Sequence, residues 1–236
     1  MSPYIQHSTN QLLATLPIED FERLTPYLER IVLKFGQIVY QSNEWIETAY
    51  FPEQAAISLV SRLSNHSSTE VGLVGNEGTI GLPIILGSNR STHEAIVQIG
   101  GTALRLDAEI LQKEFARGGA LQQQLLRYTQ ARLSQLSQIL VCQTHHAIEQ
   151  RLARWLLCLE DRTNFSEFSL TQTSIAQMLG VRRASVTDAA SILQKAELIR
   201  CRRGQIAILD RVELEARSCE CYRLMALEFD RLLGIH

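Results

Sequence analysis

Two pairs of consecutive arginines lie in the last third of the sequence, Arg182 with Arg183 and Arg202 with Arg203. A guanidinium group matches the geometry of a phosphate and of the O6/N7 edge of guanine, and it can bind either through two parallel hydrogen bonds. The first pair opens a segment with helical periodicity, although basic side chains at a helix N-terminus oppose the helix dipole. Phosphates or base edges would offset that cost. The arginines therefore indicate a partner that carries phosphate groups.

The segment that carries these arginines, residues 170–210, has the pattern of a helix-turn-helix. A first helix is predicted from about Gln172 with Thr171 as its N-cap, and Gly180 can take the left-handed conformation that the turn needs. Small and apolar side chains at helical spacing predict the buried faces of the two helices: Ile175, Ala176, Leu179, Val181, Val186 and Ala190.

A short hairpin is predicted after the second helix, over residues 198–209, with Gly204 at its turn and Arg202 and Arg203 at its tip. We interpret this hairpin as a wing that touches phosphate. A helix-turn-helix pattern alone also occurs as a purely structural corner, whereas the added basic hairpin favours DNA binding.

The charge of the chain is distributed unevenly. The net charge of the 236 residues is −2, yet residues 180–210 hold six basic side chains against three acidic ones. Such a local surplus gains affinity for DNA by counterion release while the remaining surface stays acidic.

No apolar run approaches the ~20 residues that span a bilayer, and residues 1–10 lack the regions of a signal peptide. We therefore expect a cytoplasmic protein.

The cysteines could be taken for metal ligands. Their number is odd and they show no secreted disulfide pattern, so we expect reduced thiols: Cys142, Cys158, Cys201, Cys219 and Cys221. Cys142 with His145 and His146, and Cys219 with Cys221, form two groups, but neither has the closed four-ligand spacing of a usual zinc site. We interpret the cysteines as buried or incidental, the two histidines as capping or surface residues, and predict no metal.

In the first half of the chain the spacing of apolar residues changes from helical to strand-like. Residues 11–31 have near-helical spacing and predict two short helices, and short apolar runs separated by turn residues then predict a small β-roll or barrel. Between two of these strands lies the glycine-rich segment 75–91, GNEGTIGLPIILGSNRS. It could hold an anionic ligand through its backbone N–H groups or form a tight structural corner, and composition alone favours neither.

A helical segment begins at residue 107 and contains an uninterrupted amphipathic stretch from 120 to about 140, after the break at Gly118 and Gly119. Leucines at a seven-residue repeat, with one between, predict a short coiled-coil dimer interface: Leu126, Leu133, Leu136 and Leu140. A single packed helix could show the same stripe. Residues 141–145 are a candidate hinge, and the next helix, with Leu152, Trp155, Leu156 and Leu159 facing inward, would support the helix-turn-helix. Residues 212–233 have helical spacing and carry no assigned chemistry.

The order of these elements resembles the Crp/Fnr transcription regulators over nearly the whole chain. The resemblance is carried by TxxSIAQMLGVRRASVTDAASILQKAELI, by RLARWLLCLEDR, by LLATLP and by the corner GNEGTIGLP, and the segment CECY at 219–222 looks like a feature of one branch. It implies an α+β chain with a cyclic-nucleotide-binding-like β-roll (1–118), a dimerisation helix (119–141) and a winged helix-turn-helix domain (142–236). It also implies a homodimer on a two-fold symmetric operator, with RNA polymerase as a further partner.

The resemblance also suggests which side chains touch DNA. Arg183 falls where many members carry the arginine that contacts guanine, and Thr187 and Asp188 are the other expected base contacts. Asp188 could accept from a cytosine amino group or pair with a neighbouring arginine, and we favour the ion pair slightly. Ala184 stands where many members carry glutamate, so the operator sequence should differ. The expected phosphate contacts are Thr171, Arg182, Ser185, Arg202 and Arg203.

The β-roll departs from the cyclic-nucleotide-binding members. Those members follow a glycine with a glutamate that holds the ribose and end the corner with Arg-Ser on the phosphate. Here Thr79 follows Gly78, and Arg90 and Ser91 remain. We interpret these four residues as a degenerate effector pocket, because a neutral threonine lacks the charge-assisted hydrogen bond. No cysteine precedes Cys142, so we expect no iron–sulfur cluster and name no cofactor.

The sequence leaves two other function classes open. The chain could be a ligand-binding or signalling adaptor whose winged helix contacts protein, in which case it would bind a protein partner and not nucleic acid. An enzyme is the weakest interpretation, because the sequence shows no nucleophile–base pair and no phosphate-cradling lysine loop with supporting context.

Overall fold

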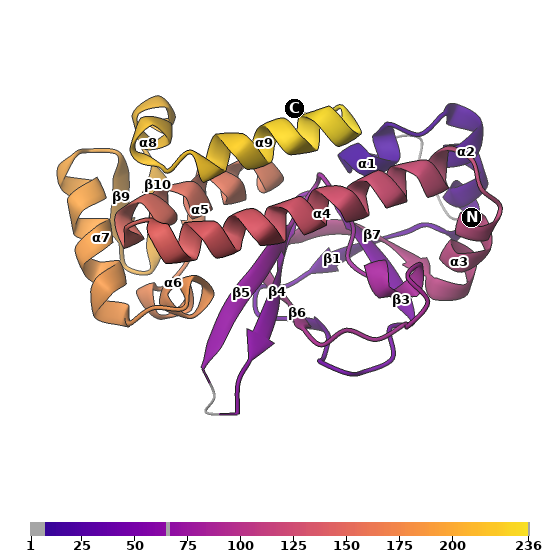
Figure 1. The fold of residues 1–236 in the computed structure, drawn as a ribbon, viewed down its shortest axis with the longest axis horizontal. Helices are drawn as coiled ribbons and strands as arrows, with labels where there is room; N and C mark the ends of the chain where they lie inside the picture. Colours follow the sequence, from indigo (N-terminus) through magenta and orange to yellow (C-terminus); the bar gives the residue numbers. More distant parts are fainter. Residues whose placement is uncertain (1–7, 65–66, 236) are drawn as a thin grey trace.

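The computed structural model describes residues 8–64 and 67–235, and Figure 1 shows their arrangement. A β-structured N-terminal part lies beneath one long helix, α4 (Ala120–His145), and the C-terminal helices and a small sheet gather around the far end of that helix. The predicted α+β organisation is confirmed. Among the described helices, none combines the length and apolar character needed to cross a lipid bilayer.

The N-terminal part begins with short helices, as predicted, and continues into two antiparallel sheets; the predicted helical range to residue 31 is too long, because strand β1 begins at Glu29. The helices are α1 (Gln11–Ala14), α2 (Ile18–Leu24) and the 3-10 turn η1 (Thr25–Tyr27). One sheet has the order β1-β7-β3, formed by Glu29–Leu33, Gly101–Asp107 and Thr48–Pro52. The other has the order β2-β6-β4-β5, formed by Ile38–Tyr40, Glu94–Ile99, Ala56–Arg62 and Ser68–Val74. Strand β7 was missed from the sequence, although it follows β6 after one glycine and joins the other sheet.

The core of this part lies between the two sheets and under the helices that follow them. Phe51, Ile57, Val97 and Leu104 have no exposed surface, as expected for alternating strand residues that face one another across two sheets. The glycine-rich corner carries the 3-10 turn η2 (Leu82–Ile84), and α3 (Ala108–Ala116) leads to α4.

Helix α4 begins after two glycines with positive φ, Gly118 (82°) and Gly119 (88°). The hinge predicted at residues 141–145 is wrong, because the helix runs without a break to His145 and the chain turns at His146, which has extended backbone (ψ 145°). The stretch 141–145 contains no glycine or proline to end the helix. Helix α5 (Ile148–Thr163) follows, with the predicted inward residues buried: Leu152, Trp155, Leu156 and Leu159.

The C-terminal segment returns to the N-terminal part. Helix α8 (Arg211–Arg217) packs on α5, and α9 (Cys221–Leu233) then runs alongside α4 (Figure 1). Phe229 of α9 meets Tyr128 of α4 edge to face, with ring centroids 6.4 Å apart. The two helices therefore bury a continuous apolar seam that ties the end of the chain to the β-roll core.

Candidate nucleic-acid interface

The first helix of the helix-turn-helix is α6 (Gln172–Leu179), and its N-terminus is capped as predicted. Thr171 Oγ1 accepts a hydrogen bond from the Ser174 backbone N–H at 3.1 Å, and the Ser174 hydroxyl lies 3.1 Å from the Thr171 backbone nitrogen. This reciprocal pair satisfies two backbone donors that a helix N-terminus otherwise leaves without a partner.

Replacing Thr171 by alanine is expected to lower the free energy of unfolding by about 0.5–2 kcal/mol, because the cap is lost. Thr173→Ala is the matched control, since Thr173 is exposed two residues further along the chain and is not the N-cap. Chemical denaturation followed by circular dichroism measures both variants. Equal destabilisation by the two substitutions would contradict the capping role.

The turn and the second helix follow the predicted pattern. Gly180 has a φ of 65°, in the left-handed region. Helix α7 (Arg183–Lys195) buries Val186 and Ala190, while Val181 in the turn is half-buried against the same core. The predicted crossing of two short helices around Gly180 is therefore confirmed.

The wing is also present. Strands β9 (Ile199–Arg202) and β10 (Gln205–Ile208) pair antiparallel, and Arg203 (φ 47°) and Gly204 (φ 80°) form the two-residue turn. Positive φ at both central residues matches the right-handed twist of a tight hairpin. A third strand, β8 (Glu167–Ser169), pairs with β10 on its other side; its three residues were too short a run to be recognised in the sequence.

A groove of 360 Å³ lies between the start of α6, the start of α7 and the wing. Four of the residues predicted to contact DNA line it: Thr171, Arg183, Arg202 and Arg203. They come from three elements, so it is the fold of the domain that brings them together. The groove joins the N-terminal end of the second helix to the hairpin tip, which are the two places where a winged helix meets the duplex.

The other predicted contacts lie beside this groove. Arg182, the N-cap of α7, and Asp188 are exposed, and Ser185 is half-buried. Thr187 is exposed, but its hydroxyl is 2.8 Å from Gln172 Oε1, so it links α7 to α6. The structure therefore gives Thr187 a local partner that the sequence did not suggest.

The arginines of this surface are not neutralised within the chain. Over residues 8–64 and 67–235, no ion pair within 4.0 Å involves Arg182, Arg183, Arg202 or Arg203. The ion pair that we favoured for Asp188 is likewise absent from the described residues. Guanidinium groups held together without carboxylates form a positive surface that attracts an anionic partner.

The residues of the predicted effector pocket have different environments. Thr79 is buried, and its hydroxyl donates to the Tyr50 carbonyl at 2.9 Å. Arg90 is exposed and lies over the Trp45 ring, 5.7 Å from its centroid, and the neighbouring Ser91 is half-buried. Gly78 packs so closely against α4 that an added Cβ would lie 2.1 Å from the Tyr128 hydroxyl. The glycine here serves close packing of the corner on α4.

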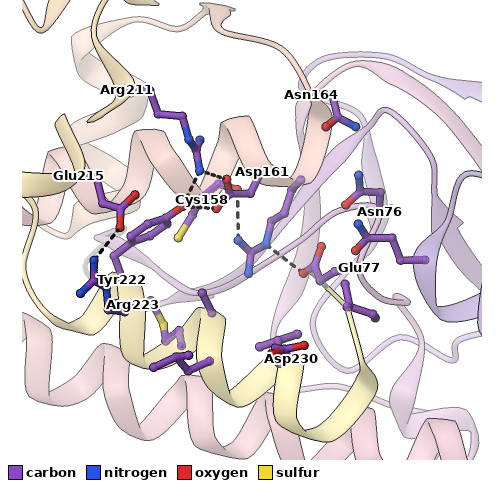
Figure 2. A pocket seen from close by; sticks show the side chains of 17 residues that line it. Asn76, Glu77, Cys158, Asp161, Asn164, Arg211, Glu215, Tyr222, Arg223 and Asp230 are labelled. Carbon is purple, nitrogen blue, oxygen red and sulfur yellow. Dashed lines mark hydrogen bonds and ion pairs between the residues drawn. The ribbon is translucent and has the colours of Figure 1, made fainter. Parts of the chain in front are cut away.

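The start of the glycine-rich corner forms a joint with α5 (Figure 2). Glu77 Oε1 lies 2.9 Å from Arg162 Nε in a buried ion pair, and the Asn76 N–H donates to the Arg162 carbonyl at 3.2 Å. Burial alone would lower the pKa of Arg162, but the Glu77 carboxylate and other nearby groups leave that pKa raised. Gly75 approaches the same residue, since an added Cβ would lie 2.3 Å from Arg162 Cβ. These contacts favour the structural-corner interpretation of this segment.

A second contact joins β5 to α5. Glu70 is buried and accepts a hydrogen bond from Trp155 Nε1 at 3.0 Å and another from the Ser58 hydroxyl. Burial raises the pKa of the Glu70 carboxyl. The β-roll and the helix-turn-helix part are therefore joined by buried polar contacts, which are costly to break.

A cavity of 530 Å³ lies beside the joint, between the corner, α5 and the C-terminal helices (Figure 2). On one side of the cavity, Arg211 contacts Asp161 at 2.6 Å and Tyr222 donates to Asp161 at 2.8 Å, and Arg211 also contacts the neighbouring Glu160 at 2.5 Å. These contacts hold α8 and α9 on α5.

Comparison with known proteins agrees with this geometry. Residues 150–217 match the model of the Crp-like helix-turn-helix domain. FixK2 from Bradyrhizobium japonicum has a similar structure, with a TM-score of 0.68 and 18% identity over 81% of this chain and 98% of that one. A putative Crp/Fnr regulator from Eubacterium rectale has a TM-score of 0.64 and 18% identity over 86% of this chain and 94% of that one.

The c-di-GMP-responsive regulator CLP of Xanthomonas campestris is similar at a TM-score of 0.65 and 13% identity, over 82% of this chain and all of that one (100%). A search of curated proteins returned no match. At these identities the solved structures establish the fold and nothing finer. Residues 150–217 thus match the Crp-like helix-turn-helix domain, and the chain has the fold of these solved Crp/Fnr structures.

Proposed function

We propose that this protein is a sequence-specific DNA-binding transcription regulator that acts as a homodimer on a two-fold symmetric operator. The groove lined by Thr171, Arg183, Arg202 and Arg203 is the observation that carries this proposal. In it, Arg183 would read a guanine edge, with Thr187 and Asp188 as further base contacts. Arg202 and Arg203 of the wing would contact phosphate, as would the remaining members of the set: Thr171, Arg182 and Ser185.

The proposed dimer uses the outward face of α4. The leucines of the predicted seam are unusually exposed for their type, at 49% for Leu126, 55% for Leu133, 38% for Leu136 and 67% for Leu140. The opposite face of the helix is buried against the β-roll and α9, so the exposed stripe is not explained by packing within the chain. A second copy that applied the same stripe would bury both in an isologous interface.

The parts of the chain then have separate roles. We propose an effector-type domain over residues 1–118, a dimerisation helix over 119–141 and a DNA-binding domain over 142–236. The pocket around Thr79 and Arg90 is proposed to be degenerate, because Thr79 is buried on the Tyr50 carbonyl and Arg90 is exposed against Trp45. RNA polymerase is the partner through which such a regulator would act.

Leu133→Ala is expected to weaken dimerisation about tenfold, because each chain loses most of a leucine side chain from the interface. Val212→Ala on α8, where Val212 is 76% exposed, is the matched control and should leave the dimer unchanged. Sedimentation equilibrium over a range of concentrations gives both dissociation constants. A monomeric wild-type protein, or equal effects of the two variants, would contradict the proposed interface.

Binding of duplex DNA should weaken as salt is added, because the arginines release counterions from the phosphates they neutralise. Fluorescence anisotropy of a labelled random-sequence duplex, titrated at several salt concentrations, measures this slope. A protein that fails to bind duplex DNA even at low salt would contradict the proposed function.

A further inference from the structure

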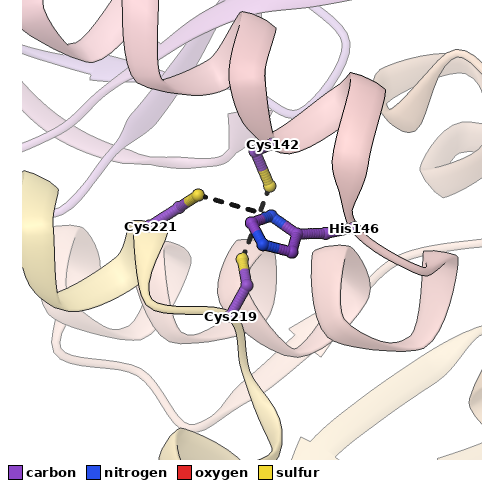
Figure 3. Close-up of side chains that lie close together, drawn as sticks. All are labelled: Cys142, His146, Cys219 and Cys221. Carbon is purple, nitrogen blue, oxygen red and sulfur yellow. Dashed lines mark hydrogen bonds between the residues drawn. The ribbon is translucent and has the colours of Figure 1, made fainter.

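Three cysteines and one histidine converge at the junction between α4 and the C-terminal segment (Figure 3). Cys142 lies in the last turn of α4 and His146 is its C-cap, whereas Cys219 and Cys221 flank the start of α9. One ligand atom from each residue lies within 4.8 Å of the other three. Cys142 Sγ is 3.5 Å from Cys219 Sγ, and Cys221 Sγ is 3.5 Å from His146 Nδ1.

From the sequence we weighed the two halves of this cluster separately and expected no metal. The fold brings them together as a closed set of four ligands of the Cys3His kind. With zinc–sulfur bonds of about 2.3 Å and zinc–nitrogen bonds of about 2.0 Å at tetrahedral angles, neighbouring ligand atoms are about 3.5–3.8 Å apart. The two distances of 3.5 Å agree with that spacing. His145, by contrast, is exposed.

The side chains around the cluster orient two of the ligands. His146 Nε2 lies 3.2 Å from Glu220 Oε2, while its Nδ1 faces Cys221. A carboxylate on the distal nitrogen of a histidine is the usual outer partner of a zinc ligand, because it fixes the tautomer and the ring plane. Gln138 Nε2 donates to Cys221 Sγ at 3.0 Å, which favours the thiolate form of that ligand.

The surrounding charge also suits a bound ion. Arg154 is only 6% exposed, and within the described chain its Nε has no hydrogen-bond partner. Its charge lies close enough to Cys142 and Cys219 to interact with both. A zinc ion with three thiolates and a neutral imidazole carries one net negative charge, which would compensate the buried guanidinium.

We propose that Cys142, His146, Cys219 and Cys221 form a structural zinc site that joins the end of α4 to the start of α9. Zinc displaces the thiol protons and is bound by all four side chains, with no position left open for a substrate. The ion would fix the bend at His146, where the chain leaves α4 for α5, and anchor α9 along α4. This proposal stands apart from DNA binding, because it rests on the ligand set alone.

Metal analysis of the full-length protein tests this site directly. Protein produced with zinc present and purified under reducing conditions is expected to hold about one zinc ion per chain by mass spectrometry. Replacing zinc by Co²⁺ should give the absorption bands of tetrahedral cobalt with thiolate ligands, and this readout needs no variant to fold. Stepwise addition of a thiol-modifying reagent, which reacts with the cysteine ligands, should release the bound zinc ion.

Variants and matched controls locate the ion. Cys142→Ser and His146→Ala are expected to lose nearly all bound zinc, whereas Cys201→Ser and His145→Ala should keep about one ion per chain. The proposal is overturned if wild-type protein binds neither zinc nor cobalt, if Cys142 and Cys219 are instead joined in a disulfide under the same conditions, or if the four variants hold equal amounts of metal.

Discussion

Glu77→Gln is expected to lower the free energy of unfolding by about 3–5 kcal/mol, because it removes one partner of a buried ion pair. Glu77 and Arg162 are 6% and 8% exposed, and Glu77 Oε1 lies 2.9 Å from Arg162 Nε. The second carboxylate oxygen accepts the Gly75 N–H at 2.8 Å, so the side chain also shapes the corner. Glutamine has nearly the same size as glutamate. The loss of unfolding free energy therefore reports the cost of leaving the buried Arg162 charge without its carboxylate partner.

The matched control makes the same substitution at an exposed ion pair. Glu29 lies 2.6 Å from Arg105, and both side chains are about half exposed, at 59% and 47%. Glu29→Gln is expected to cost about 0–1 kcal/mol, because solvent screens that pair. Urea denaturation of both variants separates the two cases. A cost below about 1 kcal/mol for Glu77→Gln would mean that the pair does not hold the β-roll on α5.

Arg183→Ala is expected to weaken binding to the preferred duplex by about 1–3 kcal/mol and to relax selectivity at one base pair, because a bidentate contact to guanine is lost. Arg203→Ala at the wing tip should instead weaken binding to all sequences alike and reduce the salt slope by about one. Both residues are exposed and line one groove, but they come from the helix start and from the hairpin turn. Their different positions predict the different outcomes.

Binding of each variant to the preferred duplex and to duplexes with single base-pair changes, at several salt concentrations, measures this division of roles. Arg223→Ala on α9 is a suitable control, because that side chain is 76% exposed and lies outside the groove. Equal losses on every duplex for Arg183→Ala and Arg203→Ala would show that neither side chain reads sequence.

The helix-turn-helix part could be predicted from sequence because its signals are local. A cap at Thr171, a turn at Gly180 and a tight hairpin at Gly204 each depend on residue types within a few positions. The core positions follow from helical spacing around them. Strand β8 could not be predicted, because three residues are too few to show an alternating pattern. Its position in the sheet depends on pairing with β10.

The contacts between distant segments could not be predicted in this way. Cys142 and His146 are one turn apart on a helix, and Cys219 and Cys221 lie far along the chain, so neither pair alone suggests four ligands. The glycine-rich corner posed the same difficulty, since Gly78 is required by Tyr128 and Gly75 by Arg162, both far away in sequence. Composition shows that glycine is needed there but does not show which neighbour requires it.

We propose that the groove between α6, α7 and the wing reads DNA sequence as part of a dimer. Selection of bound duplexes from a random library, followed by sequencing, tests it most directly. We expect enrichment of a two-fold symmetric sequence whose half-sites are about one helical turn apart, ~10 base pairs, bound by two chains. A bound pool that remains random, or that binds no tighter than unselected DNA, would contradict it.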